Sequence, residues 1–564
     1  MSAVAQPRSG YPIGPLVPWL IGFLCLSYLV AIPIGYMAYD SLTDGGFTLA
    51  AYREFFDDPK LRVAMRNSLL VAAGVAVLSV LVGAPLAFGV ARTNMRGKAI
   101  VSATMIVSLV SPDFLLAMAY IALAGPNVGY FNLALRRVFD LDIMSGPLNI
   151  FTLWGLIFTA LPHGVSYVFL TLVPALRNVD PALEEASRVQ GAGALQTLRD
   201  VTLPLMRPAL MSGALLAFAG SLAMYGPPHM LRLNVLTISI RESLIRLDFK
   251  GASAASIILI LMSLVALVVY RRSTRQAERF RTVGGKSFGG RDTDLGWVGH
   301  AFTALGIAYV LAALIVPYGG MLVISLMKSV GLGFSAGNWS FDNYRVVFAD
   351  PAVRAAAQLS ITLAASAATL VAILGFLVAH VVVRSKIPAR SLLDYLSIIP
   401  LAVPGTALAI ALAVIYLNPP LNMLGLYGSF GILFVAYITR FVTFGVRTSQ
   451  SALIQLSPEF EEASRVAGAN GLTTVGFITL PMMRQTFIYT WLLVFVLALP
   501  ELSASIILKG IHTQTLSTVL LDIWNGNGGL AQACAFGMTM FVSVATILGA
   551  AAALSRKAGI RMGG

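Results

Sequence analysis

Four ionisable side chains lie inside long apolar stretches of this chain, where a charge is costly to hold. They are Asp113, His163, Arg440 and Glu501. Ionisable groups in such a setting usually face a cavity or pair with one another, and they often mark the path of a solute or ion. Carboxylate oxygens suit a hard cation, whereas guanidinium and imidazolium groups suit phosphonate oxygens. The four residues are therefore candidate path residues of mixed charge.

These residues also have a structural interpretation. Arg440 and Glu501 can pair with each other to hold helices together, which would cancel both chemical arguments. His163 can be a packed, hydrogen-bonded side chain, and His380 lies near a predicted helix end. Two prolines that match across the halves of the chain predict kinks, which either shape a cavity or only fit the packing: Pro112 and Pro404.

The chain shows no arrangement typical of a catalytic or metal site. It has no H-E-x-x-H segment and no paired carboxylates, and its two cysteines, Cys25 and Cys534, fall in apolar runs. Residues 285–287, Gly-Lys-Ser, resemble the end of a phosphate-binding loop, but Phe280 stands where that loop needs a glycine. We therefore expect no catalytic residues, no bound metal and no ATPase activity in this chain.

A charged patch interrupts the apolar sequence twice. Residues 184–207 read EEASRVQGAGALQTLRDVTLPLMR and residues 461–484 read EEASRVAGANGLTTVGFITLPMMR, identical at 15 of 24 positions. A single copy would fit a solvated connection between two helices equally well. Two such similar copies instead favour docking segments for a partner that offers two equivalent grooves.

Each patch is predicted to form a short helix. Asp180-Pro181 and Ser457-Pro458 each place a capping residue before a proline at the first helical position. Gly191 and Gly468 can end the helices in the left-handed conformation. The glutamates lie in the early turns, where the helix dipole favours carboxylates.

Both predicted helices have an apolar edge. Leu183 and Ala186 are three residues apart in the first copy, as are Phe460 and Ala463 in the second. A helix of this length is marginal alone in water. Each one therefore needs a surface to lie against, and we expect a cytoplasmic partner to provide it.

The elements that hold these residues are predicted to be membrane-spanning helices. The chain of 564 residues is 57% hydrophobic and 11% charged, with a mean hydropathy of +0.81. An apolar run of about 20 residues spans a bilayer as a helix. Twelve such runs are predicted, near residues 19–39, 64–91, 100–124, 151–176, 208–230, 252–270, 299–327, 355–383, 391–417, 427–449, 485–508 and 530–553.

Basic residues indicate the orientation of these spans. Lys and Arg follow the second, fourth, sixth and eighth spans, which predicts that those loops and both termini are cytoplasmic. Acidic residues follow the first span, as expected for an outer loop. The formal net charge of +14 is spread over several loops, so we expect membrane lipid and no nucleic acid as a partner.

The whole chain is an internal repeat. Residues 51–69 match residues 343–361 at an offset of 292, whereas the charged patches are 277 residues apart, so the first half carries 292 − 277 = 15 extra residues between the two blocks. The predicted fold is an all-α membrane protein with about 12 transmembrane helices in two parallel six-helix repeats. Its predicted parts are residues 1–270 (first unit, docking segment 180–207), 271–298 (cytoplasmic linker) and 299–564 (second unit, docking segment 457–484).

Both patches resemble the cytoplasmic signature of binding-protein-dependent ABC importer permeases: E-A-A, three residues, G, nine residues, I-x-L-P. The copies read Glu185-Ala186-Ser187, Gly191 and Val201-Thr202-Leu203-Pro204, then Glu462-Ala463-Ser464, Gly468 and Ile478-Thr479-Leu480-Pro481. The departures are Ser for the second Ala in both copies and Val for Ile in the first. The fused layout, the linker and ELSASIILKG at 501–510 look most like the ferric-iron permease subfamily.

This resemblance implies a type I ABC importer transmembrane fold in the bacterial inner membrane. Two copies of a cytoplasmic ABC ATPase, which carry the ATP and Mg, would bind one docking helix each. A periplasmic binding protein would deliver the solute, and this chain would bind no cofactor itself. The residues implied in ATPase docking are Glu184, Glu185, Ala186, Gly191, Leu203, Pro204, Glu461, Glu462, Ala463, Gly468, Leu480 and Pro481.

The expected function is the permease of an ATP-driven importer for a small charged solute, with ferric iron as the first choice. The same machinery importing an organophosphonate, thiamine or a polyamine is the alternative. An ion-coupled secondary transporter also has twelve spans in two halves, and RTNMRGK at 92–98 faintly resembles a loop of such carriers. That loop lacks the acidic residue, and this alternative leaves the docking helices unexplained.

Overall fold

The computed structural model describes residues 13–140, 146–274, 297–526 and 529–557, and all the named elements in these parts of the chain are helices. Two isolated bridges, Thr43 to Phe47 and Met327 to Trp339, are the only extended pairings in the described residues. The prediction of an all-α fold is confirmed. The Gly-Lys-Ser segment at 285–287 and most of the predicted linker lie outside the described residues.

The long helices of the two units follow the same order, and the units differ in their short elements. In the first unit the elements are α1 (Ile13–Leu26), η1 (Ser27–Ala31), α2 (Ile32–Ser41), α3 (Ala50–Asp57), α4 (Pro59–Arg92), α5 (Lys98–Val110), α6 (Asp113–Ala124), α7 (Tyr130–Phe139), α8 (Leu153–Arg177), α9 (Pro181–Val189), α10 (Ala194–Thr197), η2 (Leu198–Thr202), α11 (Leu203–Leu222), α12 (Gly226–Met230), α13 (Leu236–Ile245) and α14 (Phe249–Thr274).

In the second unit they are α15 (Trp297–Val310), η4 (Leu311–Ile315), α16 (Val316–Ser325), η5 (Val330–Leu332), η6 (Ala336–Asn338), α17 (Asp342–Ala349), α18 (Pro351–Arg384), α19 (Arg390–Ala402), α20 (Gly405–Leu417), η7 (Leu421–Leu424), α21 (Phe430–Gln455), α22 (Glu459–Val466), α23 (Gly471–Thr474), η8 (Val475–Thr479), α24 (Leu480–Met482), α25 (Arg484–Ala498), α26 (Ser505–Leu508), α27 (Leu516–Asn525) and α28 (Gly529–Lys557).

Within the described residues, nine helices are long and apolar enough to cross a membrane, and three bent helix pairs raise the number to twelve. The predicted spans 208–230 and 485–508 are wrong at their outer ends, because the helices end at Leu222 and Ala498. Pro227-Pro228 and Pro500 follow these ends, and proline cannot donate the hydrogen bond that would continue a helix. Hydropathy alone does not register that interruption.

The third and ninth predicted spans are broken at the two matching prolines. α5 and α6 meet at an angle of 103°, and α19 and α20 meet at 110°. Pro112 and Pro404 disfavour helical backbone at the residue before them, and that residue is extended in both places, as Ser111 and Val403. The predicted kinks are confirmed, but each is a turn through more than a right angle. The N-termini of α6 and α20 therefore lie inside the protein.

The long helices α4 and α8 form the centre of the first unit, and α18 and α21 form that of the second. Their contacts rely on small residues, as is common where helices pack in membranes. A Cβ atom on Gly445 would lie 2.4 Å from the carbonyl oxygen of Val371, and one on Gly375 would lie 2.4 Å from the carbonyl carbon of Gly445. At the equivalent contact in the first unit, a Cβ on Gly83 would lie 3.0 Å from Val168.

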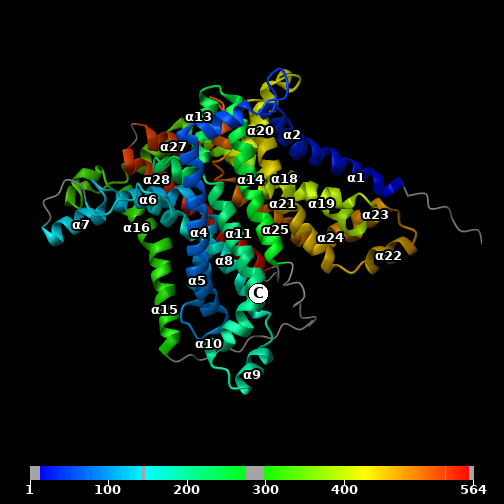
Figure 1. The fold of residues 1–564 in the computed structure, drawn as a ribbon, viewed down its shortest axis with the longest axis horizontal. Helices are drawn as coiled ribbons and strands as arrows, with labels where there is room; N and C mark the ends of the chain where they lie inside the picture. Colours follow the sequence, from blue (N-terminus) through cyan, green and yellow to red (C-terminus); the bar gives the residue numbers. More distant parts are fainter. Residues whose placement is uncertain (1–12, 141–145, 275–296, 527–528, 558–564) are drawn as a thin grey trace, which may run out of the picture.

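The first span of each unit packs against the other unit. Helices α1 and α2 lie along α18, α19 and α20, while α15 and α16 lie along α4, α5 and α6 (Figure 1). The outer helices α13 and α27 lie at one end of the molecule, and the predicted docking helices α9 and α22 lie apart from each other at the ends of two arms (Figure 1). The exchange of first spans therefore holds the two units together.

We predict that Gly445→Ala destabilises the second unit. The added Cβ meets backbone atoms that cannot rotate away, so α18 and α21 must separate, at a cost of about 1–3 kcal/mol. The apparent melting temperature of the purified protein in detergent should fall. Gly35→Ala is the control, because a Cβ there meets nothing within 4 Å. Equal melting temperatures for the two variants would show that the close helix contact is absent.

Candidate functional site

The first docking helix, α9, begins and ends as the sequence predicts. The Asp180 carboxylate accepts a hydrogen bond from the Ala182 N–H at 2.9 Å, and Pro181 is the first helical residue. Gly191 has a φ of +88°, the left-handed conformation that glycine adopts without strain. The N–H of Ala192 then donates to the Ser187 carbonyl at 3.1 Å, which satisfies the end of the helix.

The second docking helix, α22, ends in the same way but begins slightly differently. Gly468 has a φ of +89°, and the N–H of Ala469 donates to the Ser464 carbonyl at 3.1 Å. Ser457 accepts from the Glu459 N–H at 3.4 Å, a long contact, and the helix starts at Glu459. The predicted serine cap is therefore only a weak one, because Pro458 rather than Ser457 directly precedes the helix.

The first glutamate of each patch binds within the chain. The carboxylate of Glu184 accepts a hydrogen bond from the Thr202 hydroxyl at 2.9 Å, and Glu461 accepts one from Thr479 at the same distance. A second hydroxyl contact repeats in both copies, at 3.2 Å between Ser187 and Thr197 and at 3.0 Å between Ser464 and Thr474. These bonds fasten each docking helix to the segment that leads into its Leu-Pro.

An arginine at the end of the second span of each unit completes this attachment. The Arg92 guanidinium lies 3.9 Å from the Glu184 carboxylate and donates to the Val179 carbonyl at 3.0 Å. Arg384 lies 3.4 Å from Glu461 and donates to the Leu456 carbonyl at 2.7 Å. Val179 and Leu456 are 277 residues apart, like the patches themselves, so the contacts are equivalent. We call each Arg–Glu–Thr set an anchor.

The anchor of the second unit has an additional partner. His380 Nε2 lies 3.8 Å from the Glu461 carboxylate, and Arg465 lies at 3.8 Å as well. Glu461 is only 3% exposed, so its charge needs this concentration of donors. The interpretation of His380 as a satisfied helix-end group is therefore only partly met, because its Nε2 forms no hydrogen bond among the described residues.

The opposite face of each docking helix is uncovered. Glu185, Ala186, Glu462 and Ala463 are all exposed. The apolar edge is exposed too, with Leu183 at 40% and Phe460 at 51%. Exposed apolar side chains beside carboxylates are typical of a surface that binds another protein. Leu203, Pro204 and Pro481 are also exposed, whereas Leu480 is half-buried.

The Leu-Pro segments follow a widened helical turn in both units. The π-helical turns η2 and η8 end at Thr202 and Thr479, the residues that bind the anchors. The prolines at 204 and 481 then stand in the first turn of the next helix, where a missing N–H costs nothing. Turns of this type occur often at functional sites.

The four candidate path residues meet where the two units touch. Asp113 is the first residue of α6, directly after the break, and Glu501 lies between α25 and α26 rather than inside a span. The Asp113 carboxylate is attracted by His163 and Arg440 and repelled by Glu501. Arg440 Nε lies 3.7 Å from the Glu501 carboxylate. The structure thus brings together residues that are up to 388 positions apart (501 − 113).

Glu501 is held firmly within this cluster. Its carboxylate accepts hydrogen bonds from the N–H groups of Ala504 and Ser505, at 3.0 Å and 3.1 Å, and from the Ser505 hydroxyl at 3.1 Å. It is 5% exposed. Because the carboxylate caps the short helix α26, its position is set by the protein and does not depend on a bound solute.

Arg440 and His163 occupy equivalent positions in α21 and α8, and both remain partly exposed. The Arg440 guanidinium lies against Gly405, where a Cβ would come within 1.8 Å of it, so only glycine leaves room. His163 Nε2 donates to the Ser111 carbonyl at 2.8 Å. Its Nδ1 has no hydrogen-bond partner among the described residues. The partly exposed side of this cluster is therefore where a charged solute would be met.

The cluster is not arranged as a metal-binding site. Within the described chain, no group of three or more His, Cys, Asp or Glu side chains is placed to hold a metal ion. Cys25 and Cys534 are both free. A cation that passes here would be met by two separated carboxylates and would also face the Arg440 guanidinium.

Sequence reasoning missed several residues that the geometry brings in. Arg92 and Arg384 form ion pairs in the anchors, and the Thr202 and Thr479 hydroxyls donate hydrogen bonds to the anchor glutamates. Gly405 makes room for the Arg440 guanidinium. A signal existed for the first four, because each pair recurs at the repeat offset. Gly405 gave no such signal, since its counterpart in the first unit is Asp113 at the offset of 292.

Comparison with known proteins identifies the family. The family model described as "Binding-protein-dependent transport system inner membrane component" matches twice, at residues 79–281 and 371–555. A ferric transport system permease protein of Actinobacillus pleuropneumoniae is 26% identical over 501 residues, which is 86% of this chain and 69% of that protein. A probable ABC transporter permease protein of Sinorhizobium fredii is 25% identical and covers 90% of this chain and 89% of its own.

A solved structure was also matched. A chain of a bacterial alginate ABC transporter, crystallised in complex with an alginate-bound periplasmic protein, aligns with 48% of this chain and 95% of its own, at 20% identity and a TM-score of 0.38. The two matched domains occupy well over half of the present sequence. The chain therefore belongs to the family of binding-protein-dependent ABC transporter inner membrane permeases, multi-pass subunits that are not themselves ATPases, and it carries the family domain twice.

Proposed function

We propose that this permease is driven by two copies of a cytoplasmic ATPase, which bind α9 and α22 and carry the ATP and Mg. The observation that carries the proposal is the repeated docking helix, with the same internal anchor and the same uncovered apolar edge in both units. Both docking helices and both termini then lie on the cytoplasmic side. A periplasmic binding protein delivers solute at the opposite face.

The anchors supply a rigid connection for this drive. Each docking helix is tied through its first glutamate to the last residue of the second span of its unit, Arg92 or Arg384. The same arginine also binds the carbonyl at the end of the fourth span of its unit. Motion of the ATPase is thereby passed to two spans at once. ATP shifts the equilibrium between inward-open and outward-open states only as far as it favours one ATPase state over the other.

We propose ferric iron, hydrated or chelated, as the solute. Two relatives with ferric transport in their names cover most of this chain, at 26% and 24% identity. Asp113 and Glu501 add carboxylate oxygens, which suit a hard cation. The Arg440 guanidinium and the unpartnered Nδ1 of His163 favour a second candidate, an organophosphonate, because such donors suit its oxygens.

Uptake by reconstituted vesicles distinguishes the two solutes. The chain is reconstituted in vesicles with its ATPase and binding protein, and ATP is supplied on the side of the membrane where the ATPase lies. Labelled ferric iron and labelled aminoethylphosphonate are tested in parallel on the side of the binding protein. Iron uptake that depends on ATP and on the binding protein supports the proposal. Phosphonate uptake without iron uptake would replace the first candidate with the second.

Charge reversal on the uncovered face of the docking helices is expected to uncouple the transporter. Glu185→Lys with Glu462→Lys places like charges against the basic groups that we expect on the ATPase, at a cost of several kcal/mol. Uptake should fall by at least about tenfold while the protein still inserts in the membrane. Asp342→Lys is the control, an exposed acidic residue outside both docking segments. Normal uptake by the double variant would remove Glu185 and Glu462 from the interface.

The path residues are tested by comparing neutral variants at fixed ATPase activity. Arg440→Gln leaves Asp113 and Glu501 facing each other without a cation, which is costly within a membrane, so uptake should fall by about tenfold. Glu501→Gln should also reduce uptake. Arg447→Gln is the matched control, because Arg447 is an ion-paired arginine on the same helix that contacts Asp394 instead. If Arg440→Gln and Glu501→Gln both transport normally, the cluster only supports packing.

A further inference from the structure

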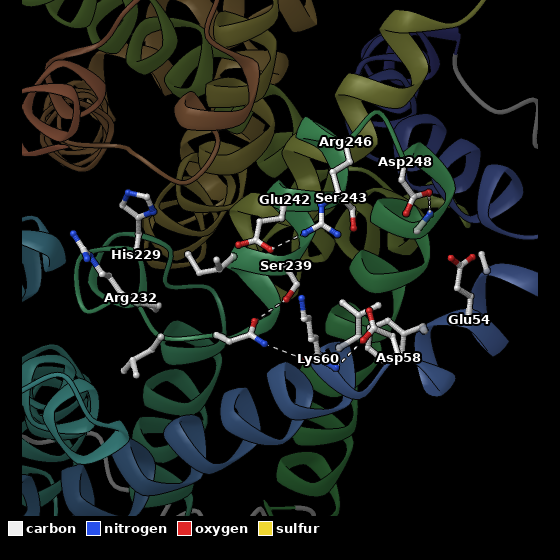
Figure 2. Close-up of a pocket in the computed structure, with 18 residues that line it drawn as sticks. Glu54, Asp58, Lys60, His229, Arg232, Ser239, Glu242, Ser243, Arg246 and Asp248 are labelled. Carbon is white, nitrogen blue, oxygen red and sulfur yellow. Dashed lines mark hydrogen bonds and ion pairs between the residues drawn. The ribbon is translucent and has the colours of Figure 1, made fainter. Parts of the chain in front are cut away.

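A charged pocket lies at the outer end of the first unit, away from the solute path cluster. Its volume is about 510 Å³, and it is formed by α3 and the start of α4 on one side and by α12, α13 and the start of α14 on the other (Figure 2). Charged side chains line both walls: Glu54, Asp58, Lys60, Arg232, Glu242, Arg246 and Asp248. The pocket is therefore polar and carries both signs of charge.

Several of these charges have no partner within the described chain. Asp58 and Asp248 accept backbone hydrogen bonds, from the N–H of Lys60 at 2.7 Å and of Gly251 at 2.8 Å. Among the described residues, Glu54, the Lys60 ammonium and Arg232 form no ion pair. Because these charges are exposed and form no ion pair among the described residues, they are available to a molecule that enters from outside.

The remaining ionisable groups of the pocket are paired or neutral. Arg246 lies 3.7 Å from Glu242 in an exposed ion pair, which contributes little to stability. Burial lowers the pKa of His229, as do the nearby Arg241 and Arg232, against a hydrogen bond with Asn525 that raises it. His229 is thus neutral at neutral pH, and its Nε2 lies 3.2 Å from the Asn525 amide of the second unit.

The rim of the pocket has the composition of a protein interface. Ile245 is 61% exposed and Leu247 is 73% exposed, and they alternate with the pocket residues Arg246 and Asp248. Leu247 and Arg232 have φ values of 61° and 54°, a conformation rare for residues with large side chains. Strained backbone of this kind gathers at binding sites. Apolar residues beside exposed charges are typical of a surface that binds a protein.

The second unit lacks several of these charges. The two outer regions are in the same register, because the Leu236 N–H donates to the Ser68 hydroxyl at 2.9 Å and the Leu516 N–H donates to Ser360 at 2.9 Å. Where the first unit has Glu54, Lys60, Ser243 and Arg246, the second has Val346, Ala352, Ile523 and Gly526, whereas Asp58 and Glu242 have acidic counterparts, Asp350 and Asp522. The two units of this repeated chain therefore present different charges at this position.

We propose that this pocket receives a charged loop from one lobe of the periplasmic binding protein, and that the charges found in it only in the first unit decide which lobe sits on which unit. The proposal rests on the proposed function, in which a binding protein delivers solute at the outer face. Binding proteins of this kind close two lobes around their ligand. Charges at an interface mainly set register and speed of association, which is what a two-lobed protein needs on a nearly symmetric surface.

The test compares the same charge placed in each unit. The complete complex with its ATPase is placed in lipid nanodiscs, and ATP hydrolysis is measured against the concentration of its binding protein. Lys60→Glu should raise the half-saturating concentration by about tenfold, which corresponds to about 1.4 kcal/mol. Ala352→Glu, the equivalent position in the second unit, should change it by less than about twofold, the range of ordinary surface substitutions. Glu54→Lys should also raise it.

Three results would overturn the proposal. Equal shifts for Lys60→Glu and Ala352→Glu would indicate a general electrostatic effect without a preferred unit. A lower maximum rate with an unchanged half-saturating concentration would exclude contact with the binding protein. A shift that appears only when anionic lipid is added would assign the pocket to lipid headgroups. If the unaltered complex does not respond to the binding protein at all, the proposed function fails instead.

Discussion

Each docking helix is held by one carboxylate that binds the end of a membrane span, half-buried in the first unit and buried in the second. Glu184 and Glu461 lie within 4 Å of Arg92 and Arg384, and each also accepts a threonine hydroxyl. A helix of nine residues or fewer would not be stable in water by itself. Removing one member of the buried pair in the second unit leaves an unpaired charge, which is costly. In the proposed function, this attachment allows a short surface helix to transmit motion.

The second feature of the structure is the pair of broken spans. α5–α6 and α19–α20 turn sharply at proline, and the residues after the breaks, Asp113 and Gly405, lie at the contact between the units. Gly405 admits the Arg440 guanidinium, which faces Glu501, while His163 stands at the equivalent place in the first unit. The repeat supplies a symmetric framework, and substitutions at equivalent positions make the centre and the outer surface asymmetric.

Local features of the sequence predicted the docking helices well, because caps, glycine ends and copied segments act within a few residues. The glycine conformations at 191 and 468 are the clearest example. Span ends near Leu222 and Ala498 were missed, because hydropathy averages over the prolines that interrupt a helix. The angles at Pro112 and Pro404 could not be predicted, since proline ends a helix without fixing its continuation. The partners of Glu184 and Asp113 depend on tertiary packing across many tens to hundreds of residues, which no local pattern encodes.

The central claim, that the anchors couple ATP hydrolysis to transport, is tested most directly by the number of solute molecules imported per ATP hydrolysed. A double-mutant cycle with Arg384→Gln, Glu461→Gln and both together isolates the contribution of the pair. The account predicts that each single variant lowers this ratio and that the double variant is no worse than either, because the lost interaction is shared. A ratio unchanged in both single variants would contradict the account.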